Sequence, residues 1–431
     1  MKEYLAKDFV VNTLGDLPYE TPAEIEWFVG ENERFLLETN PELLEKQKKE
    51  GKEFITIERA GPRKKIHFNP DTSKAAIVTC GGLCPGINNV IYSITCELIY
   101  QYKLNSVVGY RFGYQGLIDP EDPVPLTTEN VFKIAQMGGS ALSSSRGHQD
   151  VSQMVDRLVK DNINLLFLIG GDGTLRGGQH IYEEVTKRGL DIAVVAVPKT
   201  IDNDLNFISK SFGFETAYGK AVEALECAHT EATGAPNGVG LVKVMGRHSG
   251  SIACHATVAS RFANFCLIPE VPFALEGPDG LFEVLKKRLL RRLHAVIVVA
   301  EGAGQHLMPA TGKTDASGNI KMEDIGIWLR DQISDRFKKD GFPINLKYID
   351  PSYIIRAVPA EPSDALFCTF LGQYAVHAAM SGRTAVVIGQ WNSKWAHLPI
   401  SLVTADRKQV DPAGTVWRAV LETTGQKLAQ I

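Results

Sequence analysis

The sequence predicts an α/β fold with mainly parallel sheets. Short apolar runs, at 165–169 and 192–197 for example, alternate along the chain with amphipathic segments of helical length. Runs of this kind are typical of buried parallel strands, and the repeated strand–helix order favours sheets covered by helices. Because the alternation breaks near 205–237, we expect two Rossmann-like domains that face one active-site cleft.

We expect these two domains to follow an N-terminal extension over residues 1–72. The extension is rich in charge, and 24–49 has the spacing of one or two amphipathic helices. It would pack on the core or on a neighbouring subunit. Residues 73–210, with part of 355–431, would form the first α/β domain, and residues 211–354 would form the second.

The composition excludes several classes of protein. A formal net charge of −4 over 431 residues gives no reason to expect nucleic acid or an anionic membrane as a partner. Apolar runs stay well below the ~20 residues that cross a bilayer. The seven cysteines are scattered and lack the spacing of a metal set. We therefore expect a soluble, cytoplasmic protein with reduced thiols.

Two loops at strand ends carry the strongest chemical signal. The run 165–169 leads into GGDGT (170–174), and the run 192–197 leads into PKTIDND (198–204). In open α/β sheets, ligands lie beyond the carboxyl ends of the strands, so both loops are expected at one cleft. The first offers backbone N–H groups to a phosphate. The second offers the hydroxyl of Thr200 beside the carboxylates of Asp202 and Asp204.

Further residues at strand ends suit phosphate chemistry. The glycine turn 81–86 lies between a strand and a helix, a geometry that binds phosphate, and Arg146 follows a hydroxyl-rich loop. Asp172 between glycines could hold Mg²⁺. Each signal has a plainer alternative: a steric turn, a solvated loop or a turn-forming aspartate.

The remaining charged candidates divide by task. A carboxylate such as Asp202 can take the proton of an attacking hydroxyl, unless it caps its own loop. Arg247 could neutralise a transferring phosphoryl group, or form a surface salt bridge. Glu301 could accept hydrogen bonds from sugar hydroxyls, or cap a helix. Lys347 and Arg356 could bind a second phosphate, or be solvated. Together they indicate phosphoryl transfer from a phosphate-rich donor to a small, phosphorylated alcohol, without a Walker A motif.

In these motifs the sequence resembles the 6-phosphofructokinase family. The resemblance runs in order across roughly residues 74–390 and rests on GGLCPGINN (81–89), GGDGT (170–174), PKTIDND (198–204), MGR (245–247), PE (269–270), EG (301–302) and DPSYIIR (350–356). PKTIDND preceded by GGDGT is highly specific. The long DPSYIIR variant and the N-terminal extension are similar to the longer-chain members of plants, trypanosomatids and some bacteria.

The resemblance implies a role for each matching residue. It implies that the first domain binds ATP and the second binds fructose 6-phosphate, with Asp202 as the base for the C1 hydroxyl and Asp172 as the Mg²⁺ ligand. The residues implied around the nucleotide are Gly82, Tyr114, Arg146, Gly171, Gly173, Thr174, Arg176, Gly177 and Lys199. The residues implied at the sugar phosphate are Thr200, Asp202, Asp204, Met245, Gly246, Arg247, Glu301, Lys347, Tyr353 and Arg356, with Lys347 reaching in from another subunit. Of these, Thr200 and Asp204 would support the base, and Arg247 would stabilise the transferred group.

The donor and the assembly are less sharply implied. Pyrophosphate-dependent members of the family carry Asp at the position of Gly173, so the glycine of this chain favours ATP. The same members carry Lys at the position of Lys199, so this residue favours pyrophosphate. Gly238 and Tyr353 replace an arginine and a histidine of the short bacterial members. Subunit sharing of the site and the usual allosteric regulation are therefore left open. The resemblance favours a homotetramer, with a homodimer as the alternative.

Three other functions compete with this interpretation. One is the pyrophosphate-dependent fructose 6-phosphate 1-phosphotransferase. Another is an NAD or lipid kinase, which shares GGDGT but does not account for PKTIDND or DPSYIIR. The third is a non-catalytic subunit that binds sugar phosphate, and such a subunit would be expected to have lost the base or the metal acid.

Overall fold

The chain forms two compact units of α/β structure. The computed structural model describes residues 4–309, 312 and 322–428. Unit 1 comprises Met1–Thr200, Leu205–Gly213 and Val358–Arg407, and unit 2 comprises Ile201–Asp204, Phe214–Ala357 and Lys408–Ile431. The division expected from the sequence stays a prediction. None of the described helices combines the length and apolar character needed to cross a membrane.

Unit 1 is built on a nine-stranded sheet with a parallel centre. Its order is β3-β4-β17-β16-β10-β9-β6-β7-β8. The parallel strands are β6 (Lys74–Thr79), β7 (Ser106–Tyr110), β9 (Leu165–Gly170), β10 (Ala193–Pro198) and β16 (Val386–Trp391). In the register of β9 and β10, Gly170 lies opposite Pro198. The two acidic loops therefore leave the same edge of the sheet side by side.

The outer strands of this sheet are antiparallel and were not expected. They are β8 (Val124–Pro125) at one edge, and β17 (Lys394–Pro399), β4 (Thr56–Arg59) and β3 (Arg34–Leu36) at the other. The N-terminal extension thus adds β3 and β4 to the main sheet. The helical prediction for 24–49 was wrong except over α1 (Pro41–Lys49), which has no buried residue.

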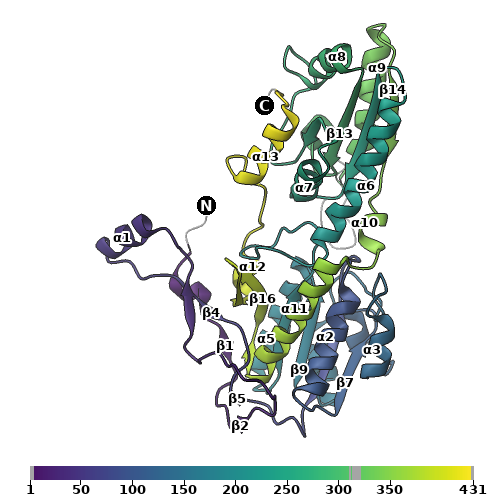
Figure 1. Cartoon of the computed structure of the whole chain (residues 1–431). Helices are drawn as coiled ribbons and strands as arrows, with labels where there is room; N and C mark the ends of the chain where they lie inside the picture. Colours follow the sequence, from purple (N-terminus) through teal and green to yellow (C-terminus); the bar gives the residue numbers. More distant parts are fainter. Residues whose placement is uncertain (1–3, 310–311, 313–321, 429–431) are drawn as a thin grey trace. The chain divides into compact units, whose positions relative to one another are not determined.

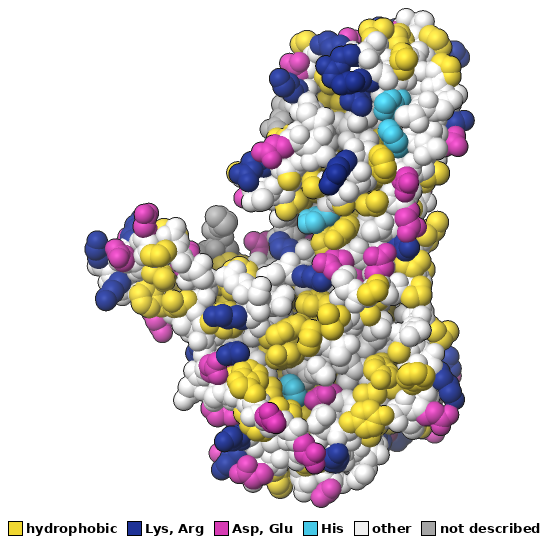
Figure 2. Space-filling model, in the orientation of Figure 1, with side chains coloured by type: hydrophobic (Ala, Val, Ile, Leu, Met, Phe, Trp, Pro, Cys, Tyr) yellow, Lys and Arg dark blue, Asp and Glu magenta, His cyan; other side chains and the backbone are white. Residues whose placement is uncertain are grey.

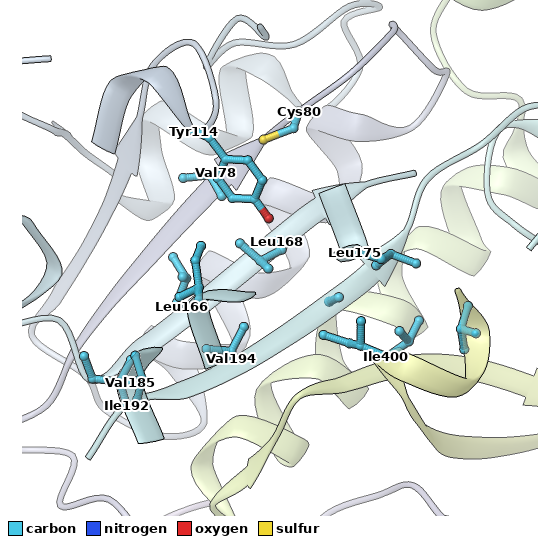
Figure 3. Close-up of a cluster of buried hydrophobic side chains, with 14 of the residues drawn as sticks. Val78, Cys80, Tyr114, Leu166, Leu168, Leu175, Val185, Ile192, Val194 and Ile400 are labelled. Carbon is cyan, nitrogen blue, oxygen red and sulfur yellow. The ribbon is translucent and has the colours of Figure 1, made fainter. Parts of the chain in front are cut away.

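Helices cover both faces of the unit 1 sheet (Figure 1). They are α2 (Ile87–Tyr100), α3 (Thr128–Ile134), α4 (Val151–Lys160), α5 (Asp172–Lys187), α11 (Pro362–Met380) and α12 (Ile400–Val403). Helices α2 and α11 pack on each other and cover one face. On the other face, alternate residues of the strands, such as Leu166, Leu168 and Val194, pack against α4 and α5 (Figure 3). Alternation therefore sets which strand residues meet which helices.

Unit 2 has a smaller sheet that is parallel throughout. Its order is β12-β13-β11-β14. Its elements are α6 (Phe214–Thr233), β11 (Gly238–Val244), α7 (Ser251–Ser260), β12 (Phe265–Leu267), α8 (Leu281–Arg292), β13 (His294–Ala300), α9 (Ile325–Lys339), β14 (Asn345–Ile349), α10 (Ile354–Ala357) and α13 (Thr415–Thr424). Its core joins β11 and β13 to α8 and α9. Figure 2 shows Lys and Arg side chains gathered over α8.

Short pairings complete the described structure. Strand β1 (Asn12–Thr13) pairs with β15 (Arg383–Thr384), and β2 (Tyr19–Glu20) pairs with β5 (Lys65–Ile66). Single 3-10 turns occur at η1 (Ala6–Phe9), η2 (Gln115–Leu117) and η3 (Gln305–Leu307). The pairing of β1 with β15 joins the N-terminal extension to the core, and the pairing of β2 with β5 lies within the extension. The α/β class with parallel sheets, predicted from sequence, is confirmed.

Candidate active site

The first acidic loop is the opening turn of a helix. The sequence suggested a loop over 170–174, but Gly171 is the N-cap and α5 begins at Asp172. The backbone N–H groups of a helix N-terminus lack partners within the helix and attract anions. A Cβ built on Gly173 meets no atom within 4 Å, so the space beside this residue is open. The turn can therefore receive a phosphate without side-chain obstruction.

Arginines surround the carboxylate of Asp172. Its Oδ2 lies 3.2 Å from Arg176 Nε and 3.7 Å from Arg407 Nη2. The Arg176 guanidinium also donates a hydrogen bond to the carbonyl of Thr404. Within the described residues no cluster of three His, Cys, Asp or Glu side chains could hold a metal. A single carboxylate beside a phosphate site nevertheless fits Mg²⁺, which commonly uses one or two carboxylates and completes its shell with phosphate oxygens and water.

Tyr114 supports this turn from beneath. Its hydroxyl donates a hydrogen bond to the Thr174 carbonyl at 2.6 Å, and burial raises the pKa of the phenol. Its ring lies against α5, where a Cβ on Gly177 would come within 2.5 Å of the ring. Figure 3 shows Tyr114 among the core side chains. The contacts of Tyr114 with Thr174 and Gly177 thus hold the first turns of α5 in position.

Lys199 holds three neighbouring loops of unit 1 together. Its Nζ donates to the carbonyl of Gly82 at 2.7 Å, and its backbone N–H donates to Gly170 at 2.9 Å. The same glycine turn is tied to the hydroxyl-rich loop, because Ser144 Oγ donates to the Gly81 carbonyl at 2.6 Å. Hydrogen bonds therefore link the turn after β6 to both the Ser144 loop and the end of β10. Arg146, two residues after Ser144, is exposed there.

The second acidic loop is anchored at both ends. Ser211 Oγ donates to the Thr200 carbonyl at 2.5 Å, and the backbone N–H of Lys408 donates to the Asp204 carbonyl at 2.9 Å. Asn203 has a φ of 50°, a left-handed conformation that asparagine tolerates better than most residues. This conformation bends the chain between the two aspartates. Both aspartates are partly buried.

In unit 2 two adjacent strand ends bring Arg247 and Glu301 together. The backbone N–H of Glu301 donates to Val244 at 2.9 Å, and that of Gly302 donates to Gly246 at 3.1 Å. A side chain at Gly302 would collide with the Arg247 carbonyl, because its Cβ would lie 2.0 Å from that oxygen. Met245, Gly246 and Arg247 thus lie next to Glu301. Burial raises the pKa of Glu301, and the charge of Arg247 opposes that shift.

Of the other residues predicted at the sugar phosphate, Arg356 lies near Glu301, whereas no described contact links Lys347 to it. The guanidinium of Arg356 lies 4.8 Å from the ring centroid of Tyr353, which is 75% exposed. Arg356 also stabilises the charged form of Glu301, so it belongs near that cluster. Lys347 lies within β14, opposite Gly240, and is exposed. No described contact joins Lys347 to Glu301.

Sequence reasoning missed several charged residues that the fold brings to these loops. Arg407 and Lys408 come from a segment left as a mixed tail, yet they contact the loops of Asp172 and Asp204. Lys243, inside β11, bridges Asp324 and Asp350 at 2.9 and 2.8 Å. No local motif marks any of them. The one available signal was a basic pair, Arg407-Lys408, next to a short apolar helix.

The fold and this set of groups define a class of protein: an α/β protein with a glycine-rich helix start suited to binding phosphate. Comparison with known families then gives the identity of the group. The Phosphofructokinase family matches residues 74–379. The chain belongs to the phosphofructokinase family.

Full-length relatives carry more specific names. The chain is 48% identical to the ATP-dependent 6-phosphofructokinase of Borreliella burgdorferi, over 98% of this chain and 97% of the relative. It is 45% identical to that of Amycolatopsis methanolica, over 97% and 95%. It is 46% identical to that of Trypanosoma cruzi, over 86% and 77%.

Solved structures share the fold at lower identity. A pyrophosphate-dependent phosphofructokinase from Marinobacter aquaeolei aligns with a TM-score of 0.66 at 20% identity, covering 83% of this chain and 93% of that one. Pichia pastoris phosphofructokinase in the T-state aligns with a TM-score of 0.64 at 23% identity, covering 82% and 37%. These likenesses support the fold and do not distinguish the phosphoryl donor.

Proposed function

We propose that this chain is an ATP-dependent 6-phosphofructokinase of glycolysis. It transfers the γ-phosphoryl group of ATP to the C1 hydroxyl of D-fructose 6-phosphate and releases fructose 1,6-bisphosphate and ADP. The observation that carries this proposal is the 48% identity over 98% of the chain to a relative of that name. The acidic loops at the ends of β9 and β10 provide the chemistry such a reaction needs.

We assign the chemical step to the second acidic loop. Asp202 accepts the proton of the C1 hydroxyl as its oxygen attacks phosphorus, with Thr200 and Asp204 holding the loop in place. Arg247 balances the negative charge that spreads over the transferring group. Glu301, Met245, Gly246, Tyr353 and Arg356 hold the sugar phosphate, and Lys347 joins them from a second subunit.

We assign the donor phosphates to the first turn of α5 and the loops around it. The N–H groups after Gly171 receive phosphate oxygens, with Gly82, Thr174 and Arg146 around them and Arg176 and Gly177 nearer the adenosine. Bound at Asp172, Mg²⁺ would supply positive charge that offsets the phosphates. For that, Asp172 has to exchange part of its contact with Arg176 and Arg407. The two arginines orient this carboxylate beside the phosphate site.

ATP is preferred over pyrophosphate because of Gly173. The open space beside this residue leaves room for the phosphates nearest the adenosine, where an added carboxylate would crowd and repel them. Lys199 is the residue that favours pyrophosphate by its charge, yet its ammonium group donates to the Gly82 carbonyl. We therefore interpret Lys199 chiefly as a residue that holds the donor loops in place. The pyrophosphate-dependent reaction stays the alternative.

A comparison of donors tests the proposal. Purified enzyme is supplied with fructose 6-phosphate, Mg²⁺ and either ATP or pyrophosphate at equal concentration, and fructose 1,6-bisphosphate is measured. We expect turnover with ATP to exceed that with pyrophosphate by about 100-fold, which corresponds to a few kcal/mol of transition-state stabilisation. Gly173→Asp should depress ATP use by a similar factor, since a carboxylate then faces the phosphates. Turnover that is faster with pyrophosphate would establish the alternative.

Further properties are part of the same proposal. We expect a cytoplasmic enzyme that requires Mg²⁺, assembles as a homotetramer or, alternatively, a homodimer, and responds to allosteric effectors. We expect no partnership with nucleic acid or membranes, because the formal charge of −4 is small for 431 residues.

A further inference from the structure

The segment that follows α12 runs along several loops of unit 2. The backbone N–H of Lys408 donates to the Asp204 carbonyl at 2.9 Å. Gln409 Nε2 donates to the carbonyl of His248 at 3.0 Å, and the N–H of Val410 donates to Glu270 Oε1 at 2.8 Å. Glu270 also accepts from the N–H of Gly250 at 2.9 Å. Consecutive residues are thus fastened to three different loops, which fixes the direction of the backbone at Lys408.

The side chain of Lys408 is placed where its charge acts on Asp204. Lys408 is partly buried, and burial lowers the pKa of its ammonium group to about 8, while the carboxylate of Asp204 opposes that shift. The charge of Lys408 also acts on His255 on α7, which in addition interacts with Glu215 on α6. A partly desolvated ammonium ion is stabilised by a nearby carboxylate, and the attraction is mutual.

Holding Asp204 also restrains Asp202, which lies two residues away on the same loop. A catalytic base must keep its position to within a fraction of an ångström. Two carboxylates separated by one residue repel each other, and a positive charge beside Asp204 offsets this repulsion and so restrains the loop.

We propose that Lys408 is a positioning residue for the catalytic loop: its main-chain N–H and its ammonium group hold Asp204, and through it keep Asp202 in place. The proposal deepens the proposed function, on which it rests for the roles of the two aspartates. It also assigns a task to the segment after α12.

The test compares Lys408→Met and Lys408→Arg with wild-type enzyme. Methionine keeps the length of the side chain and removes the charge, whereas arginine keeps the charge. We expect Lys408→Met to lower kcat by about 10-fold or more, with the KM for ATP changed by less than about 3-fold, because a transition-state interaction is lost. Lys408→Arg should restore most of kcat. Lys286→Met is the matched control, since Lys286 pairs with Asp340 on the surface of the same unit, and it should leave kcat unchanged.

A second measurement does not depend on activity. Hydrogen–deuterium exchange is followed in a peptide covering 199–207, where Lys408→Met should accelerate exchange while Lys286→Met should not. Wild-type kcat in Lys408→Met together with unchanged exchange would overturn the proposal. Equal losses in the Met and Arg variants would also overturn it, because packing and not charge would then matter. Wild-type enzyme that fails to phosphorylate fructose 6-phosphate would instead refute the proposed function, and the exchange result would still decide the role of Lys408.

Discussion

Single side chains at the ends of β9 and β10 carry most of the chemistry proposed here. Asp172, Asp202 and Asp204 were all identified from the sequence, because acids that follow buried strands have few structural reasons to be there. The structure adds which groups hold them: Arg176 and Arg407 for Asp172, and Lys408 for Asp204. The acids could be found from local pattern, whereas their basic partners come from distant segments and could not.

Asp202→Asn tests the base directly. The amide keeps the shape of the side chain but cannot accept the proton, so kcat should fall by about 10²- to 10⁴-fold while the KM for fructose 6-phosphate changes little. Steady-state kinetics with ATP and Mg²⁺ measure both constants. Asp156→Asn, which alters an exposed partner of Arg188, is the control and should retain activity. A rate within a few-fold of wild type in Asp202→Asn would remove Asp202 from the role of base.

At the scale of elements, α5 shows that local sequence pattern does not always predict where a helix begins. The glycines of GGDGTLRGG predicted a loop, but α5 already begins at Asp172 and includes Gly173 and Gly177. The strands expected at 165–169 and 192–197, in contrast, match β9 and β10 to within one residue at each end, because short, continuous apolar runs mark buried strands. Glycine lowers the helix propensity of a segment, so its presence argues against a helix when only the sequence is known. Here glycine is needed because the Tyr114 ring packs directly against Gly177, and that contact is visible only in the folded structure.

Alanine at two of the glycines of α5, Gly177 and Gly173, should have opposite effects on stability. Gly177→Ala places a Cβ 2.5 Å from the Tyr114 ring, so it should destabilise the protein by about 1–3 kcal/mol through overpacking. Gly173→Ala meets no atom within 4 Å, so it should be neutral or raise stability by up to about 1 kcal/mol through better helix propensity. Thermal unfolding of both variants measures the difference. If the two variants lose stability equally, the ring contact does not limit the packing of α5.

At the scale of the whole molecule, a buried charge network joins the N-terminal extension to the main sheet. Glu58 on β4 accepts hydrogen bonds from Arg383 Nε at 3.0 Å and from His397 Nδ1 at 2.9 Å. Arg383 also donates to Glu31 at 2.8 Å. The sequence could not predict this network, because charged residues at 24–65 look like a solvated surface until their partners near the C-terminus are known.

The network should make the protein sensitive to acid. Burial would raise the pKa of Glu58, but His397 and Arg383 outweigh it and lower the pKa to about 2. Since this pKa lies below the ordinary value of 4.5, the stabilisation is present above pH 4.5 and is lost as the pH falls towards 2. Thermal unfolding between pH 7 and pH 3 should show the loss.

Glu58→Gln supplies the control for that experiment. The variant should be less stable at pH 7 by about 3–5 kcal/mol, because the buried guanidinium of Arg383 loses its carboxylate partner. Its stability should then fall less steeply with acid than that of the wild type. Parallel pH profiles in the two proteins would show that other groups dominate the response to acid.

The position of β16 has a consequence for the way this chain is made. Strand β10 lies between β9 and β16, and β16 is followed by β17, which carries β4 and β3. During translation, residues 4–200 therefore emerge from the ribosome long before β16 is synthesised. Until residues 386–391 are available, the edge of β10 has no neighbouring strand on that side. An open apolar edge of this kind invites wrong pairing between nascent chains. Late synthesis of one central strand thus makes this protein a candidate for assistance by chaperones during translation.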